Sequence, residues 1–200
     1  MIFSSLDKVN RNRVASILSA IGCGLLLTAA AHAQDTNAPR TELDAFESGT
    51  GVVIVRGSGE IGVVTTATGA VVVRCKESVE AGSGRKQYGL AITLTGKDQQ
   101  SDTTIIDYAE LDSFLRGLDF LQRANWSLTA LPSFDAIYTT RDGLQAAAYS
   151  SQRQPGTLGA SLKSARSVRV RVPLAAQDFA LFRGLIQQAK AKIEALRAGQ

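Results

Sequence analysis

The hydrophobic positions between residues 51 and 95 follow the two-residue period of β-strands. Runs rich in Val, Ile and Thr are separated by glycines, and in 88–95 Leu90, Ile92 and Leu94 alternate with smaller or polar residues. This alternation puts one face of a strand against a core and the other toward solvent. The pattern predicts strands at 52–55, 61–66, 71–75 and 88–95, with turns at Gly57–Gly59, at Thr68–Gly69 and over 77–84.

Two later segments have the 3.6-residue period of an amphipathic helix. In 107–123, Asp107 followed three residues later by Glu110 is typical of a capping box at a helix start. Gly117 weakens this helix by about 1 kcal/mol relative to Ala, and a glycine there often permits close packing against a neighbouring element. The expected apolar stripe of 107–123 is Leu111, Phe114, Leu115, Leu118 and Leu121; that of 175–198 is Phe182, Leu185, Ile186, Ala189, Ile193 and Leu196.

A second group of strands is expected between and around these helices. Strands at 134–140 and 144–151 flank Arg141-Asp142-Gly143, a strong hairpin signal. A last strand at 165–172 ends at Pro173. The order strands, helix, strands, helix predicts an α+β fold with antiparallel sheet built from hairpins, and a pseudo-repeat of 51–123 and 134–197. The two helices are expected to cover one face of the sheet.

The first 33 residues have the three parts of a secretory signal peptide. Residues 1–13 carry three basic residues against one acid, residues 14–29 are apolar and uncharged, and Ala31-His32-Ala33 precedes Gln34. We expect cleavage near Ala33 and a periplasmic or secreted protein. The alternatives are a retained membrane anchor, for which the apolar run is short, and a lipoprotein modified at Cys23. A polar arm at 34–50, with a short helical turn at 41–46, and one domain at 51–198 complete the expected organisation.

The composition excludes several classes of active site. The chain is 44% hydrophobic and 20% charged, which is typical of a globular protein. Without residues 1–33 it has no histidine, since His32 is the single one, and Cys75 is its one cysteine. A Ser-His-Asp triad, a Cys-His pair, an internal disulfide and a zinc site built on His or several Cys are therefore excluded. We expect no metal and no cofactor. Cys75 is expected to be a small buried side chain, with an intermolecular disulfide or a reactive thiol as alternatives.

Charge is divided unevenly along the expected mature chain. Residues 34–142 hold 10 basic and 15 acidic residues, whereas residues 143–200 hold 9 and 2. Arg166, Arg169 and Arg171 in the last expected strand are the candidate contacts for an anionic ligand or partner. The alternative is a solvated strand face, or pairing with acids of the first half. No aromatic residue lies among these arginines, so nucleic acid is not an expected partner.

Other charged and glycine-rich segments have simpler interpretations. Ser83-Gly84-Arg85-Lys86 matches Ser-x-x-Lys by chance in a hairpin loop, and neither glycine-rich turn has the spacing of a phosphate loop. Asp112 and Asp119 are expected on a solvated helix face, with a carboxylate or Ca²⁺ site as the alternative.

Three functions are consistent with this sequence. The first is an exported binding or accessory protein of unknown ligand, whose partner is another envelope protein or a second copy paired through an exposed sheet edge. The second is a hydrolase or transferase that uses Asp, Glu, Lys or Tyr with Ser or Cys groups. It requires a deep pocket with a carboxylate or lysine of shifted pKa, near candidates such as Cys75, Tyr88, Tyr108 and Asp107. The third is association with an anionic membrane through the basic residues of the last helix, Arg183, Lys190, Lys192 and Arg197.

Overall fold

Two sheet-helix units follow one another along the chain in this computed structural model, which describes residues 38–150, 158–164 and 170–199. The first sheet has the order β1-β2-β3-β4 and the second β5-β6-β7-β8, with every neighbouring pair antiparallel. The α+β class and the succession of hairpins are thus confirmed. The first unit comprises β1 (Ile54–Thr66), β2 (Gly69–Glu80), β3 (Lys86–Thr95), β4 (Ser101–Asp107) and α2 (Leu111–Gln122). The second comprises β5 (Asp135–Thr139), β6 (Gln145–Ser150), β7 (Leu158–Lys163), β8 (Arg171–Leu174) and α3 (Ala176–Ala198).

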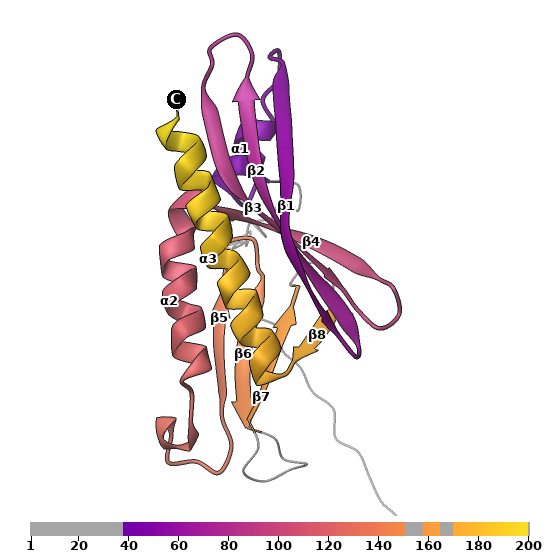
Figure 1. Cartoon of the computed structure of the whole chain (residues 1–200), viewed down its shortest axis with the longest axis vertical. Helices are drawn as coiled ribbons and strands as arrows, with labels where there is room; N and C mark the ends of the chain where they lie inside the picture. Colours follow the sequence, from indigo (N-terminus) through magenta and orange to yellow (C-terminus); the bar gives the residue numbers. More distant parts are fainter. Residues whose placement is uncertain (1–37, 151–157, 165–169, 200) are drawn as a thin grey trace, which may run out of the picture. The chain divides into compact units, whose positions relative to one another are not determined.

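Each long helix packs mainly on the sheet of the other unit. α2 follows β4 but contacts β5 and β6, whereas α3 follows β8 and lies across β1 and β2, with further contacts to β3, β7 and β8 (Figure 1). The two helices also contact each other. Their buried side chains join those of both sheets in one hydrophobic cluster, which includes Phe114 and Leu118 of α2 and Phe182 and Ile186 of α3. The two units therefore share the main hydrophobic core, and the two helices do not cover one face of a single sheet as expected.

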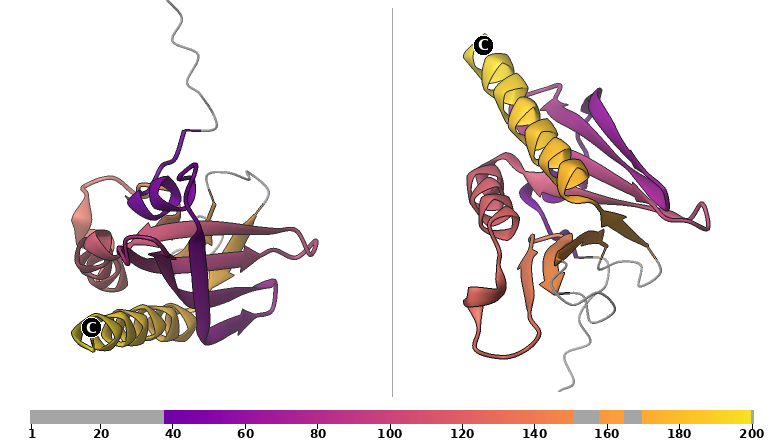
Figure 2. Two further views of the ribbon diagram at one scale, coloured as in Figure 1. Left: turned by 90° about the horizontal axis from the view of Figure 1, so that it is seen from above. Right: turned by 60° about the horizontal axis from the view of Figure 1, so that its bottom comes forward.

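A short helix, α1 (Glu42–Glu47), covers the opposite face of the first sheet from α3 (Figure 2). The helical turn expected at 41–46 is therefore present. Leu43 is fully buried against Ala91 and Ile105, whose neighbours Leu90 and Ile106 point into the main core. The side chains of adjacent strand residues point to opposite faces, so the first sheet is apolar on both. α1 thus packs into the folded body although it lies in the segment expected to be a polar arm.

The glycine-rich segment at 57–59 is not a turn. β1 runs through it as one strand, and its pairing with β2 continues from Ile54 to Thr66 with one irregularity between Glu60 and Gly62. β2 likewise extends to Glu80, so the expected loop over 77–84 contracts to a turn that contains Gly82 and Gly84. Glycine tolerates extended as well as turn conformations, and here long antiparallel pairing decides between them.

Two strands, β4 and β7, were not among the expected elements. The consecutive apolar pair Ile105-Ile106 breaks the alternation in β4, because β4 is covered on both faces. β7 consists largely of small residues. The last expected strand begins in residues 165–169, which lie outside the described residues, and β8 continues through Pro173. A proline is tolerated there because β8 is an edge strand.

The expected capping box at Asp107 is wrong. A 3₁₀ turn, Tyr108–Glu110, precedes α2, and Asp107 makes no side-chain cap to it. Both carboxylate oxygens of Asp107 instead accept backbone N–H groups from α1, Glu42 at 2.8 Å and Leu43 at 3.0 Å. Glu110 accepts the N–H of Arg141 at 3.0 Å. The two carboxylates thus bind backbone N–H groups that are distant in the sequence and do not cap the helix start. These N–H groups need a protein acceptor because burial removes them from water.

Gly117 confirms the expectation of close packing inside the first long helix. A Cβ built on Gly117 would lie 2.3 Å from Cδ2 of Tyr138 in β5. The Tyr138 ring in turn packs against that of Phe114, with 5.6 Å between the two ring centroids. The absence of a side chain at residue 117 therefore brings α2 close to the second sheet, which offsets its unfavourable helix propensity.

Candidate functional site

Glycine occurs three times on the side of β1 that faces α3. A Cβ on Gly62 would lie 2.7 Å from Cδ2 of Leu185 in α3, so a larger residue there would require the Leu185 side chain to move. Gly57 and Gly59 pair with Glu77 and Cys75 of β2. A Cβ on Gly59 would meet no atom within 4 Å, so no neighbouring group occupies the space beside it. Gly57 and Gly59 are exposed on the edge strand, and the absent side chains at these positions leave an open groove between strand and helix.

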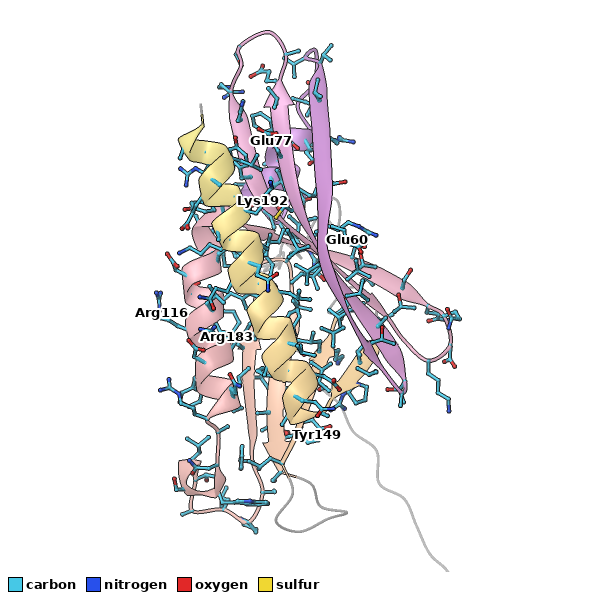
Figure 3. The ribbon with its side chains drawn as sticks, in the orientation of Figure 1. Glu60, Glu77, Arg116, Tyr149, Arg183 and Lys192 are labelled. Carbon is cyan, nitrogen blue, oxygen red and sulfur yellow. The ribbon has the colours of Figure 1, made fainter. Side chains whose placement is uncertain are left out.

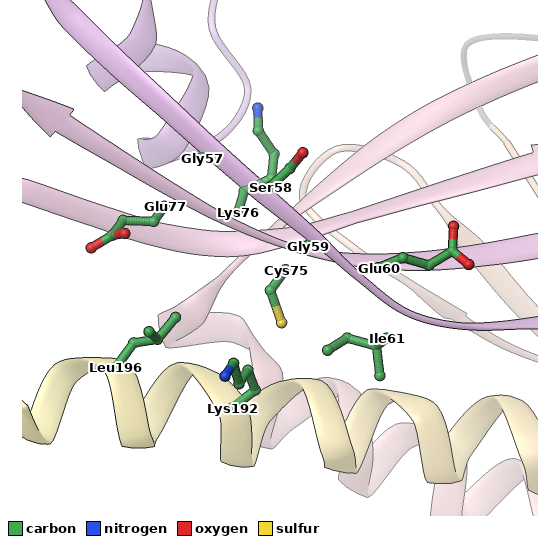
Figure 4. Close-up of a pocket in the computed structure, with 10 residues that line it drawn as sticks. All are labelled: Gly57, Ser58, Gly59, Glu60, Ile61, Cys75, Lys76, Glu77, Lys192 and Leu196. Atoms are coloured by element: carbon green, nitrogen blue, oxygen red, sulfur yellow. The ribbon is translucent and has the colours of Figure 1, made fainter.

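That room forms a pocket of about 200 Å³, which we call the glycine pocket (Figure 4). β1 and β2 form one wall and the last turns of α3 form the other. Its lining includes Gly57, Gly59, Ile61, Cys75, Lys192 and Leu196. Leu196, expected on the buried stripe of α3, is 37% exposed and lies beside the pocket. The two glycines at 57 and 59 were noted in the sequence, but they were interpreted as part of a turn, so the pocket was not predicted.

Cys75 is buried beneath the pocket, as expected for a small apolar side chain. It is 6% exposed, and its thiol donates to the backbone carbonyl of Ala189 at 3.5 Å. Burial raises the pKa of the Cys75 thiol, and the nearby ammonium of Lys192 opposes this with a smaller effect. A thiol with a raised pKa stays protonated near neutral pH and is a weak nucleophile. This geometry suits a packing role better than covalent chemistry.

The charged groups around the pocket differ in whether they have a partner. Lys76 pairs with Glu47 at 2.8 Å, Glu60 with Arg74 at 3.4 Å, and Glu77 with Lys86 at 3.5 Å. Among the described residues Lys192 makes no ion pair, and it lies on α3 below the Cys75 thiol (Figures 3 and 4). The glycine pocket therefore combines an apolar floor with one uncompensated positive charge.

The other basic residues of α3 are engaged within the protein. Arg183 pairs with Asp119 of α2 at 2.8 Å, and Lys190 pairs with Asp112 at 2.8 Å. These bonds lower the pKa of both aspartates. The two aspartates, expected to be merely solvated, thus also link the two helices. Arg197 lies 4.2 Å above the ring of Tyr108. None of the described helices has both the length and the apolar composition to span a membrane.

Of the three arginines expected to contact an anion, the structure describes Arg171. It is exposed on β8, its Nε donates to the hydroxyl of Ser161 at 3.1 Å, and its guanidinium lies 5.1 Å from the ring centroid of Tyr149. Lys163 stands directly opposite Arg171 in the register. Arg166 and Arg169 lie outside the described residues. An anionic contact at these arginines stays a prediction, on a different sheet from the glycine pocket.

Three buried carboxylates surround the hairpin turn at Arg141–Gly143. Asp142 accepts the N–H of Ile105 at 2.7 Å, which satisfies a donor on β4, an edge strand of the first sheet. Asp107 and Glu110 accept the backbone donors already described. Oε2 of Glu110 is buried without a hydrogen-bond partner, and the side chain is 7% exposed. In the described parts of the chain no cluster of His, Cys, Asp and Glu has the arrangement of a metal site. These carboxylates hold together α1, β4 and the hairpin formed by β5 and β6.

The stability of the protein should depend on the ionisation of Glu110. Burial and the charges of Asp107 and Asp142 raise its pKa, against the opposing effects of the Arg141 N–H and charge. A raised pKa means that the folded state binds this proton more tightly than the unfolded chain. The resulting stabilisation is present below the unfolded pKa and is lost as pH rises through the folded pKa. We expect Glu110→Gln, which is never charged, to gain stability relative to the wild type as pH rises.

Urea unfolding of both proteins at pH 4.5, 6.0 and 7.5 measures this difference. Changes common to both proteins, such as protonation of exposed carboxylates, cancel in the comparison. A difference in unfolding free energy that is constant with pH, or that favours the variant more at pH 4.5, would contradict the expectation.

No protein-family model matches the chain, and no curated protein matches it either. The case for a function therefore rests on the chain's own residues, and the glycine pocket is the site with the clearest chemistry.

Proposed function

We propose that this protein is an exported small binding protein, and that its ligand occupies the glycine pocket. The observation that carries the proposal is the space beside Gly59, where any other residue would place a side chain. Ligand sites are typically concave, mostly apolar and provided with a few polar groups. The glycine pocket has these properties on a small scale. Export rests on the signal-like residues 1–33, which lie outside the described residues.

Binding is better supported than catalysis by the groups near the pocket. The Cys75 thiol has a raised pKa, which disfavours the thiolate that a nucleophile needs. Asp107, the candidate general base, has both oxygens occupied by backbone donors. Tyr88 donates to Glu77 at 3.0 Å. A hydrolase or transferase without histidine remains the alternative. Tyr88 and Tyr108 line one cavity of about 370 Å³, but neither Cys75 nor Asp107 lines it.

The third function, membrane association through α3, requires that helix to leave the core. Three side chains of its apolar stripe, Phe182, Ile186 and Ile193, are buried to 2% exposure or less. The expected partners, another envelope protein or a second copy through a sheet edge, stay predictions. β1 is an edge strand of the first sheet and exposes Val55 and Val63, which is consistent with strand pairing but does not identify a partner.

A titration of residues 34–200 with two eight-carbon probes, octan-1-ol and octanoate, tests the proposal. Backbone ¹⁵N–¹H spectra report both affinity and location. We expect saturable shifts of the Gly59, Cys75 and Lys192 amides with at least one probe. Gly59→Leu fills the space and should weaken binding ten-fold or more.

The matched control is Gly82→Leu, which adds the same side chain in an exposed turn where a Cβ meets no atom within 4 Å. It should leave binding unchanged. Far-ultraviolet circular dichroism and Tm identify any variant that fails to fold. Absence of saturable shifts with both probes, or equal affinities for wild type and a folded Gly59→Leu variant, would overturn the proposal.

A further inference from the structure

We infer that the glycine pocket selects small amphiphilic anions, such as medium-chain carboxylates, and that the ammonium of Lys192 binds the anionic group. This inference rests on the proposed function, because it names the chemistry of the ligand for the same pocket.

The first argument is the balance of charge at the pocket. Four charged side chains line it: Glu60, Lys76, Glu77 and Lys192. The first three have ion-pair partners in Arg74, Glu47 and Lys86. Lys192 has no such partner among the described residues, and the other cations of α3 are held by Asp119, Asp112 and the Tyr108 ring. The uncompensated charge is therefore positive, and an anion complements it.

The second argument is where that charge acts. The Lys192 ammonium acts electrostatically on the buried Cys75 thiol, so its field reaches the base of the pocket. Figure 4 shows Lys192 on the helix below Cys75, whereas Lys76, Glu60 and Glu77 extend away from the thiol. A carboxylate bound at Lys192 can thus place its hydrocarbon chain against Ile61 and the glycine backbone. Lys192 is exposed, so the contact combines a charge-assisted bond at the rim of the pocket with apolar contact along its lining.

The third argument is size and polarity. The pocket volume of about 200 Å³ is below the range of roughly 300–1,000 Å³ that is usual for drug-sized ligands. A short hydrocarbon chain suits it better than a long acyl chain or a polymer. Leu196, exposed at 37%, offers apolar surface that a bound chain would cover. Size, apolar lining and one cation without an ion-pair partner among the described residues together favour a small amphiphilic anion.

The test compares octanoate with octan-1-ol, which has the same chain length and no charge at pH 7.5. We expect the wild type to bind octanoate at least five-fold more tightly at low salt. Lys192→Gln should remove this preference while leaving the affinity for octan-1-ol within two-fold. Raising the salt concentration from about 50 to 500 mM should reduce the preference, because salt screens partly exposed charges.

Lys190→Gln is the matched control. It makes the same change of charge on the same helix, but Lys190 binds Asp112 and Glu194 rather than lining the pocket. It should retain the preference for octanoate. A preference that persists in Lys192→Gln, or is lost equally in Lys190→Gln, would overturn the inference.

The outcomes separate this inference from the function on which it rests. Equal affinity for the two probes, with both weakened by Gly59→Leu, would leave the binding function standing and refute selection of anions. Binding of neither probe would refute both. Octanoate binding that is insensitive to Gly59→Leu would place the anion outside the glycine pocket and also refute both.

Discussion

Asp107→Ala should lower the free energy of unfolding by about 2–4 kcal/mol, because it leaves two buried backbone donors without an acceptor. The Asp107 side chain is fully buried, and its two oxygens accept the N–H groups of Glu42 and Leu43 at 2.8 and 3.0 Å. Among the described residues no other side chain accepts a hydrogen bond from these two N–H groups. The guanidinium of Arg141, 3.8 Å from the carboxylate, would also lose its nearest buried counter-charge.

Urea denaturation at pH 7.5, followed by circular dichroism, measures this loss. Asp107→Asn has nearly the same shape and keeps one acceptor oxygen, so it should lose roughly half as much. Asp98→Ala, in the exposed turn between β3 and β4, makes the same deletion where no buried donor depends on it, and should stay within about 0.5 kcal/mol of wild type. A loss for Asp107→Ala no larger than that for Asp98→Ala would show that the donors find other partners.

The role of Asp107 also shows where reading the sequence reaches its limit. Asp107 and Glu110 have the spacing of a capping box. Rules based on neighbouring residues cannot predict that Asp107 instead binds N–H groups 64 and 65 residues away in the sequence. Where the periodicity is long and the packing one-sided, local rules succeed. The stripe of α3 was expected through Phe182, Ile186 and Ile193, all of which are buried. The hairpin at Arg141–Gly143 also forms as expected, with Gly143 at a φ of 91°.

Strands fail prediction when they are covered on two faces or built from small residues. Ile105 and Ile106 are both buried because α1 lies over one face of β4 and the main core over the other. An alternating pattern cannot arise in such a strand. The glycine pocket was hidden for a related reason. Gly57 and Gly59 indicate a turn when the chain is considered locally, and only the position of α3 shows that their missing side chains open a cavity.

Phe182→Ala should lower the free energy of unfolding by about 3–5 kcal/mol and destabilise both sheets together. Phe182 of α3 is fully buried, with its ring centroid 6.2 Å from that of Phe114 in α2. The Phe114 ring lies 5.6 Å from that of Tyr138 in β5. These three rings connect the two helices and the second sheet at the centre of the shared core. Because each helix covers the sheet of the other unit, a cavity at Phe182 should weaken both units at once.

Two probes of unfolding separate this expectation from independent folding of the units. Fluorescence of Trp126, whose ring lies 5.9 Å from Phe134 next to β5, reports on the second unit. The backbone amide of Ile92 in β3 reports on the first by NMR. We expect coincident urea transitions in the wild type and in Phe182→Ala. Phe120→Ala makes the same deletion at a side chain of α2 that is 52% exposed, and should change stability by less than about 1 kcal/mol. Separated transitions would mean that the two sheet-helix units unfold independently. The packing of each helix on the sheet of the other unit would then not couple their unfolding.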